Sequence, residues 1–399
     1  MVHYCRVCGS PECREVFSHD DTPLFIGIIG DETPADLVDI RLPVSLVVCE
    51  NCSTVQQADN PKVEALLDQI YIASQDNACS GTRTGEGEFG LQRAQEFLQK
   101  TGLSRMPKRV LEVGCNEGHM LKFCEGMGAE TLVGIEPSVE KEIQLGKSTT
   151  ILPGYFDGSV FPKESFDLVY LISVFEHIPN VAAFLRDVRD VLAPGGRLAL
   201  SVPNCETGLK YGNLGMPIHE HLLYFTPISL RSAIERAGFS IVREDATFAN
   251  LYCVAEKSDN ILKEKFMDSV DSDLFWPAVE SRIRYTQQFI ETHSDRWGFY
   301  GACSLTTNLL AWGPNIDLSK GCIVDADPNK WGRVVSGCKI PTLPPLDATA
   351  EGTREFLVMP FGFQESIRDH IVQHYPEMKP TMLFEGLALQ YEFLRGSDA

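Results

Sequence analysis

The chain has 399 residues, of which 44% are hydrophobic and 23% are charged, a composition typical of a globular protein and not of a disordered or fibrous one. This length exceeds one ordinary hydrophobic core, so we expect roughly two or three domains. The formal net charge of -20 argues against nucleic acid as a partner, because a phosphate backbone demands a basic surface.

The start of the chain and its cysteine content indicate a cytoplasmic protein. The first residues, MVHYCRVCGS, lack the apolar core of a signal peptide, and the longest early apolar run, 24–29, is too short to span a membrane. Thirteen cysteines are typical of a reducing compartment in which some thiols bind metal. We therefore expect no membrane segment and a small-molecule substrate.

Two C-x2-C pairs in the first part of the chain predict a zinc site. The pairs are Cys5 with Cys8 and Cys49 with Cys52. Each pair places two sulfurs on one tight turn, and two such turns complete a tetrahedron of thiolates with no open position, so the site is expected to be structural. The stretch between the pairs is expected to be rich in loops and to depend on metal for its folding. The alternative is four unrelated buried or free cysteines.

A helical pattern over Glu64–Ile72 and a second one over Leu91–Thr101 precede the central motif. Small and polar residues at 73–90 predict a loop or lid between them.

The chain is organised around RVLEVGCNEGH at Arg109–His119. A buried strand runs into a glycine turn and then a helix, which is how an open α/β sheet presents a ligand site. At Gly114 and Gly118 the backbone can approach a ligand closely, because no Cβ intervenes. The candidate cofactor contacts in this motif are Glu112, Gly114, Cys115, Asn116, Glu117 and Gly118.

The next strand, Leu132–Ile135, ends on Glu136, a position suited to accept the two hydroxyls of a ribose. The turn lacks the G-x-G-x-x-G of dinucleotide sites. Glu112 and Glu117 disfavour a pyrophosphate but tolerate the cationic sulfonium of S-adenosylmethionine (SAM). The motif resembles motif I of class I SAM-dependent methyltransferases. An ordinary glycine turn in another α/β protein is the alternative.

Strands and helices then alternate, which predicts a mostly parallel, doubly wound sheet. The strands are expected at Phe166–Ile172 and Arg197–Val202, with a helix at Ala182–Leu192 between them. Ser173, at the end of the first of these strands, is a further candidate cofactor contact. Asp157 is expected either to bind the adenine amino group or to be a solvated loop acid.

The stretch Met216–Phe225, MPIHEHLLYF, gathers three titratable side chains between two apolar runs. His219, Glu220 and His221 on a loop beside a cofactor site are candidates for acid–base catalysis. Structural histidines are the alternative, and the spacing of the two histidines is only a weak metal signal.

The remainder is expected to close the methyltransferase sheet and to begin a second Rossmann-like unit. A helix at Ser229–Gly238 and a strand from Phe239 close the first unit, and helices over Glu256–Asp273 and Trp276–His293 act as a connector. A strand and glycine turn at Trp297–Cys303, a strand in 322–332 that ends at Asp325 and Asp327, and a strand in 354–363 follow without a phosphate loop. This pattern favours a core or substrate-cleft role over a second nucleotide site. The expected domains are 1–70, 71–255 and 256–399.

Together these parts resemble the sugar C-methyltransferases of deoxysugar biosynthesis, which have a zinc-binding domain, a SAM domain and a C-terminal Rossmann-like domain. The marks are the paired cysteines, HEHLLYF at His219–Phe225, and YGACSLTTNLL with IVDADPNKWGR at 300–310 and 323–333. The resemblance implies methylation of the carbon beside the ketone of a nucleotide-linked 4-keto-deoxysugar. It also implies His221 as the base, with Glu220 and His177 nearby.

Carbon methylation needs a base to remove a proton beside a carbonyl, which suits a histidine. Two positions differ from the family pattern: Ile218 replaces a tyrosine, and the lid run keeps only Tyr71 and Ser74. Three alternatives therefore stay open: an O- or N-methyltransferase acting on another small metabolite, a zinc-ribbon adaptor without catalysis, and a nucleic-acid methyltransferase, which the acidic charge disfavours. The sequence leaves the oligomeric state open.

Overall fold

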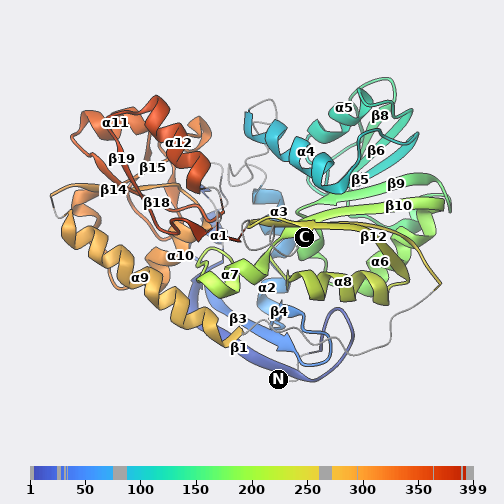
Figure 1. Cartoon of the computed structure of the whole chain (residues 1–399), viewed down its shortest axis with the longest axis horizontal. Helices are drawn as coiled ribbons and strands as arrows, with labels where there is room; N and C mark the ends of the chain where they lie inside the picture. Colours follow the sequence, from blue (N-terminus) through green and yellow to red (C-terminus); the bar gives the residue numbers. More distant parts are fainter. Residues whose placement is uncertain are drawn as a thin grey trace.

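A computed structural model describes residues 4–24, 28–30, 33, 35–74, 88–259, 272–293, 295–362, 364–387 and 390–391. Its strands form three larger sheets and one two-stranded sheet. Figure 1 shows two lobes, one built from the middle of the chain and one from its C-terminal part, with the N-terminal strands below and between them.

The largest sheet has the order β12-β13-β10-β9-β5-β6-β8-β7. Its strands are β5 (Arg109–Val113), β6 (Thr131–Glu136), β7 (Ile143–Gln144), β8 (Thr149–Pro153), β9 (Phe166–Ile172), β10 (Leu192–Pro203), β12 (Phe239–Ala246) and β13 (Asn250–Lys257). Strands β8, β6, β5, β9 and β10 are parallel, and β13 is antiparallel to β10. This is the strand arrangement of class I methyltransferases, and the predicted doubly wound, mostly parallel sheet is confirmed.

Helices cover both faces of this sheet, as a doubly wound fold requires (Figure 1). α4 (Glu88–Thr101) and α5 (His119–Glu125) lie on one face, and α6 (Val181–Val191) and α8 (Pro227–Arg236) on the other. The strands are apolar because both faces are covered: Val169, Tyr170 and Leu171 of β9 are fully buried. The chain crosses from one side of β5 to the other between β8 and β9. Ligands of such sheets bind at this switch, beyond the carboxyl ends of the strands.

The N-terminal part is a sheet, which corrects the expectation of a loop-rich stretch. Its order is β1-β3-β4-β11, with β1 (Cys13–Pro23), β3 (Arg41–Cys49), β4 (Val55–Gln57) and β11 (Leu223–Tyr224). β1 was not predicted, because most of its residues are polar and Phe17 is its only buried side chain before Thr22. The last strand, β11, comes much later in the chain than the other three. Residues 223–224, shortly after His221, therefore complete the N-terminal sheet. Three short helices lie in this part of the chain: α1 (Ala35–Val38) before β3, and α2 (Pro61–Glu64) and α3 (Leu67–Ser74) after β4.

The C-terminal lobe is a parallel sheet of order β17-β15-β14-β18-β19. Its strands are β14 (Trp297–Tyr300), β15 (Gly321–Val324), β17 (Thr342–Leu343), β18 (Glu355–Val358) and β19 (Lys379–Met382). Its helices are α9 (Phe275–Thr292), α10 (Ser304–Trp312), α11 (Pro345–Ala350) and α12 (Gln364–His374). A two-stranded sheet joins β16 (Val334–Val335) to β2 (Ile28–Ile29), so this lobe also contacts the N-terminal part.

Two further expectations from the sequence were wrong in part. The helix expected over Glu64–Ile72 is interrupted, because α2 ends at Glu64 and α3 begins at Leu67. The stretch Glu256–Asp273 was expected to be a helix, but its first two residues belong to β13. Residues 260–271 of that stretch lie outside the described residues. Residues 251–255 of β13, which pairs with β12, are buried on both faces of the strand. The stretch 250–257 therefore lacks the alternation of apolar and polar residues by which a strand is recognised in a sequence.

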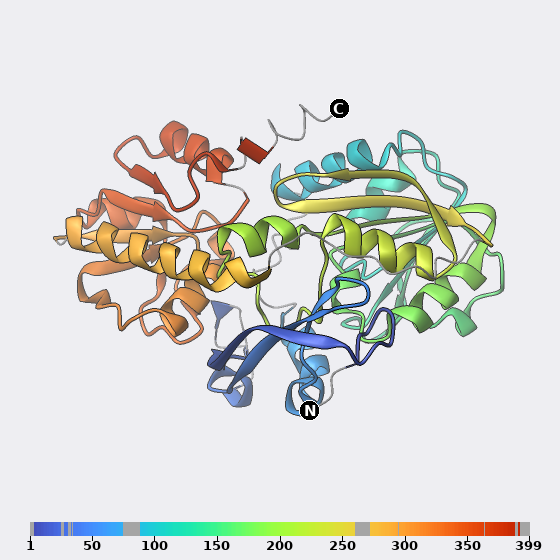
Figure 2. The same ribbon diagram turned by 60° about the horizontal axis from the view of Figure 1, so that its bottom comes forward.

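α7 (Cys205–Tyr211) lies between the two lobes (Figures 1 and 2). Gly212 ends this helix with φ of 71°, and a Cβ there would lie 2.5 Å from the backbone of α9. One hydrophobic cluster contains Phe17 of β1, Leu209 of α7 and Trp297 of β14, so the lobes share a core. Among the described residues, no helix is long and apolar enough to cross a membrane.

Candidate active site

The glycine turn after β5 has a shape that only glycine permits at two points. Gly114 has φ of 72°, and a Cβ there would lie 2.5 Å from Cγ2 of Val174. Gly118 has φ of 75°, and its Cβ would lie 2.5 Å from Cδ1 of Leu145. The turn thus lies directly against Val174, in the segment that leaves β9. The segments that follow β5 and β9, where the site was expected, therefore lie against each other.

Glu136 joins the turn to the end of β6. Its Oε2 accepts a hydrogen bond of 2.9 Å from the backbone N–H of Asn116, and its Oε1 accepts one of 2.7 Å from the hydroxyl of Ser138. Asn116 has φ of 49°, a left-handed conformation that asparagine tolerates better than most residues. The carboxylate is held at the edge where a ribose would lie.

Glu112 lies in the interior and not at the rim of the turn. The hydroxyl of Tyr170 on β9 donates to its Oε2 at 2.8 Å, and burial raises the pKa of Glu112 to about 8. At neutral pH this carboxyl is therefore protonated. Cys115 is also buried, whereas Glu117 lies at the surface and bonds to Nε2 of His119 at 2.9 Å.

The remaining predicted cofactor contacts lie at the ends of β8 and β9. Asp157 is exposed and caps the short turn of 158–160, its Oδ1 accepting from the N–H of Ser159 at 2.8 Å. Ser173 has φ of 55°, a strained conformation of the kind that collects at functional sites. Its hydroxyl accepts from Arg93 of α4 at 2.9 Å.

The structure brings His177 and His221 together. Their ring centroids lie 4.8 Å apart with an interplanar angle of 77°. Nδ1 of His177 donates to the backbone carbonyl of Glu220 at 2.7 Å. Burial lowers the pKa of His177 to about 4 and holds that of His221 well below its usual value, with the neighbouring His177 as a second cause. Both rings are neutral at pH 7 and can accept a proton or hold a polar ligand.

Two carboxyls accompany these rings, and only Glu220 was predicted from the sequence. Burial raises the pKa of Glu220 to about 7. Glu176, which was not predicted, is 1% exposed, and neither of its carboxyl oxygens has a partner among the described residues. It has an oxygen within 4.8 Å of ring nitrogens of both His177 and His221. Burial raises its pKa to about 8. The signal that was available is its place directly before His177 at a strand end.

His219 does not join this group. It is fully buried on the other side of the loop, where its Nε2 lies 3.3 Å from the carbonyl of Pro43 in β3. Burial lowers its pKa. For Tyr71 the backbone lies in α3, but its side chain is outside the described residues. Most of the lid expected at 73–90 is outside them as well.

The four cysteines of the two C-x2-C pairs form one cluster, with all four sulfurs within 4.8 Å of one another. Sγ of Cys5 lies 3.5 Å from that of Cys52, and Sγ of Cys8 lies 3.6 Å from that of Cys49. A tetrahedron with metal–sulfur distances of about 2.3 Å has edges of about 3.8 Å, so these residues fit zinc. Both the backbone N–H and the side-chain amide of Asn51 donate to sulfurs of the cluster at 3.4 Å. Asn51 was not predicted, and such donors are typical of a thiolate site.

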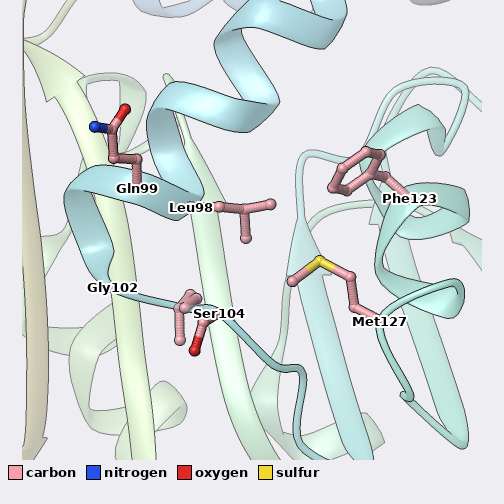
Figure 3. Close-up of a pocket in the computed structure, with 7 residues that line it drawn as sticks. Leu98, Gln99, Gly102, Ser104, Phe123 and Met127 are labelled. Atoms are coloured by element: carbon pink, nitrogen blue, oxygen red, sulfur yellow. The ribbon is translucent and has the colours of Figure 1, made fainter.

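A pocket of about 440 Å³ lies away from these residues. Figure 3 shows it between the end of α4 and the end of α5, and the lining residues are Leu98, Gln99, Gly102, Leu103, Ser104, Phe123 and Met127. Gly102 and Ser104 precede β5, whereas the glycine turn follows it. The pocket is therefore at the opposite end of the sheet from the site.

Comparison with known proteins agrees with the class that the sheet and the turn define. Residues 88–244 match the model of a family described as a methyltransferase domain. The match supports a methyltransferase, and the matched residues include the glycine turn and the loop that carries His221.

Individual relatives cover only part of the chain. It is 27% identical over 253 residues to the C-methyltransferase NovU of Streptomyces niveus, over 60% of this chain and 57% of NovU. It is 26% identical over 191 residues to phosphoethanolamine N-methyltransferase 1 of Arabidopsis thaliana, over 44% of this chain and 38% of that protein. The chain thus spans little more than half the length of NovU. Among solved structures, 1,6-didemethyltoxoflavin-N1-methyltransferase of Burkholderia thailandensis matches 52% of this chain and 96% of its own, at 16% identity and a TM-score of 0.39.

Proposed function

We propose that this protein is a SAM-dependent C-methyltransferase that acts beside the ketone of a nucleotide-linked 4-keto-deoxysugar. The observation that carries the proposal is the pairing of His177 with His221 where β9 ends, against the glycine turn after β5. The resemblance to sugar C-methyltransferases and the similarity to NovU support carbon as the acceptor.

In this proposal SAM is held at the edge formed by the Gly114–Gly118 turn, Glu136 and Ser173. Glu136 would accept from the ribose hydroxyls, and the glycine turn would let the amino-acid portion approach the backbone. SAM supplies an electrophilic methyl group. The chain's own contribution is then to generate a nucleophilic carbon and to hold it in line with that methyl.

His221 is the proposed base. Its imidazole is neutral at pH 7, so a nitrogen lone pair can take the proton from the carbon beside the ketone. The electron pair of that C–H bond moves to the carbonyl oxygen and forms an enolate. The enolate carbon would be the nucleophile for the methyl group that SAM supplies, and the loop that carries His221 would hold it in line with that methyl.

Glu176 supports His221 in this role. A low pKa makes an imidazole a weak base. Burial raises the pKa of Glu176 to about 8, so its carboxyl offsets this only in the ionised fraction of molecules, where its negative charge stabilises the imidazolium as it forms. Neither carboxyl oxygen of Glu176 has a hydrogen-bond partner among the described residues, and the group lies beside the ring. Glu220, whose pKa is near 7, is the second proton-handling group on the loop.

The four-cysteine cluster is proposed to hold a structural zinc ion. All four ligands come from the protein, which leaves no open position for a reacting group. The sulfur positions and the donors from Asn51 support this assignment.

The test uses nucleotide-linked 4-keto-deoxysugars in deuterated water, followed by proton NMR with and without SAM. Loss of the proton signal beside the ketone without SAM, and a new C-methyl signal with SAM, are expected. His221→Asn should remove both, whereas His374→Asn, on the exposed end of α12, should change neither. Loss of neither signal across the panel, with SAM still bound, would overturn the proposal.

An O- or N-methyltransferase acting on another metabolite is the second candidate. The observation that favours it is Ile218, an apolar side chain where the related sugar enzymes carry a tyrosine. The similarity to an N-methyltransferase points the same way. In that case His221 would deprotonate a hydroxyl or an amine. SAM would be consumed without any deuterium exchange at a substrate carbon.

A further inference from the structure

Two neighbouring glutamines on β4 contact different parts of the molecule. Gln56 is fully buried and Gln57 is 3% exposed. Successive side chains of a strand point to opposite faces, so these two amides serve different neighbours. Buried amides of this kind are stable only when their donors and acceptors are used.

Gln56 binds the first cysteine pair. Its Oε1 accepts a hydrogen bond of 2.8 Å from the backbone N–H of Arg6, and its Nε2 donates to the carbonyl of Tyr4 at 2.9 Å. These two backbone groups flank Cys5. The side chain of Gln56 therefore fixes the segment that presents Cys5 to the cluster.

Gln57 binds the loop that carries His221. Its Nε2 donates to the carbonyl of Ile218 at 3.0 Å, and its backbone N–H donates to the carbonyl of Leu222 at 2.9 Å. One residue thus spans the loop from end to end. The hydroxyl of Tyr224 donates to the same Ile218 carbonyl at 3.1 Å.

The opposite side of this loop is held by the segment that follows β9. The backbone N–H of Leu222 donates to the carbonyl of Glu176 at 3.0 Å, and Nδ1 of His177 donates to the carbonyl of Glu220 at 2.7 Å. His221 lies between these two sets of bonds. Its ring faces His177 from a loop that both the N-terminal sheet and the segment after β9 hold by hydrogen bonds.

We propose that Gln57 is a positioning residue for His221 and that Gln56 links it to the four-cysteine cluster. The N-terminal sheet is then part of the catalytic apparatus, since folding of the cluster sets the place of the base. The catalytic half of this inference rests on the proposed function. The structural half, the hold of Gln57 on the loop, does not. A displacement of the base by about 1 Å is enough to slow a reaction by about a hundredfold.

The first measurement needs no substrate. In Gln57→Met, which keeps the length of the side chain but removes its amide, the backbone amides of His221 and Leu222 should exchange with deuterium about tenfold faster or more. Metal content and SAM affinity should stay at the level of the parent. Gln144→Met, on the exposed edge strand β7, is the matched control and should leave these amides unchanged. Unchanged exchange at His221 and Leu222 in Gln57→Met would overturn the proposal.

The second measurement addresses catalysis. Gln57→Met should lower the SAM-independent deuterium exchange of the substrate by about 10- to 100-fold, as a loss in kcat and not in KM. Gln56→Met should loosen the same amides while the C-terminal sheet, at Phe299 and Leu357, keeps its protection. If Gln57→Met does not fold, Tyr224→Phe tests the same Ile218 anchor through the loss of one hydroxyl. A parent protein that exchanges no substrate proton would overturn the proposed function, and the amide measurement would still decide the hold of Gln57.

Discussion

Nδ1 of His177 donates a hydrogen bond to the backbone carbonyl of Glu220 at 2.7 Å. A carbonyl can only accept a hydrogen bond, so Nδ1 carries the proton of the neutral ring and Nε2 is unprotonated. Burial lowers the pKa of His177 to about 4, and the ring therefore keeps this tautomer at neutral pH. The carbonyl that accepts this hydrogen bond belongs to the peptide bond between Glu220 and His221. His177 thereby orients the base from the methyltransferase side of the loop.

Replacing His177 with phenylalanine should slow catalysis without abolishing SAM binding. The ring volume is kept, but the hydrogen bond to Glu220 is lost, so His221 gains freedom. We expect substrate deuterium exchange to fall by about 10- to 100-fold. Titration calorimetry with SAM is expected to give the affinity of the parent. A variant with normal exchange would show that the loop needs no anchor from His177.

The buried carboxyl of Glu112 predicts a particular dependence of stability on pH. Folding raises its pKa from 4.5 to about 8, so between these values the folded state holds a proton that the unfolded chain has lost. Because the folded state binds more protons, the free energy of unfolding falls as pH rises through this window. Glu176 acts in the same direction. His177, whose pKa is lowered from 6.5 to about 4, acts in the opposite direction, but only below about pH 6.5.

Glu112→Gln should remove one part of this slope. Glutamine keeps an acceptor for the hydroxyl of Tyr170 but carries no titrating proton. One proton changes the free energy of unfolding by about 1.4 kcal/mol per pH unit. The difference in free energy of unfolding between variant and parent should therefore shift in favour of the variant by up to about 2 kcal/mol from pH 6.5 to pH 8. Denaturant unfolding at the two pH values measures this gain. Equal changes in parent and variant would mean that Glu112 is ionised in the folded protein.

The sequence predicted the methyltransferase sheet well because its strands carry their own signals. The strand Phe166–Ile172 was placed at the observed bounds, since a buried parallel strand is a continuous apolar run. The N-terminal sheet could not be found in this way. Its edge strand β1 has only three buried side chains. Its fourth strand, β11, comes from residues 223–224, and no local pattern indicates a pairing over such a separation.

The same reasoning applies to the candidate site. Gly114 and Glu136 were predictable because chain order fixes where parallel strands end. Gln57 was not, because its importance depends on which neighbours its side chain faces across the fold. The place of Glu176 directly before His177 was a signal for its position, but not for the burial of its carboxyl. His219 shows the converse. It stands two residues from His221, yet it points to Pro43 on the other side of the loop.

Loss of one cysteine ligand should empty the metal site. Cys49→Ser removes a thiolate from the cluster, and we expect metal content, measured by atomic emission, to fall from about one zinc ion per chain to none. The thermal unfolding midpoint should fall with it. Cys13→Ser is the matched control, because Cys13 lies opposite Cys49 in the pairing of β1 with β3 but is outside the cluster. Zinc retained by Cys49→Ser, or absent from the parent, would contradict the assignment.

Gly114 and Gly195 separate backbone strain from crowding at the cofactor turn. Their φ angles are nearly equal, 72° and 74°, but a Cβ on Gly114 would lie 2.5 Å from Val174, whereas a Cβ on Gly195 would meet nothing within 4 Å. Gly195→Ala should therefore cost only the left-handed conformation, about 1–2 kcal/mol of unfolding free energy, and leave SAM binding intact.

Gly114→Ala bears the same strain and must also displace Val174, which leads directly into Glu176 and His177. We expect it to weaken SAM binding by about tenfold or more, since the turn and the end of β9 are forced apart. The double variant Gly114→Ala, Val174→Ala should recover much of this loss, because the second change removes the Cγ2 atom that the new Cβ would strike. Titration calorimetry on the three variants distinguishes the two causes. If Gly114→Ala and Gly195→Ala bind SAM equally well, the contact between the glycine turn and the segment leaving β9 plays no part in the site.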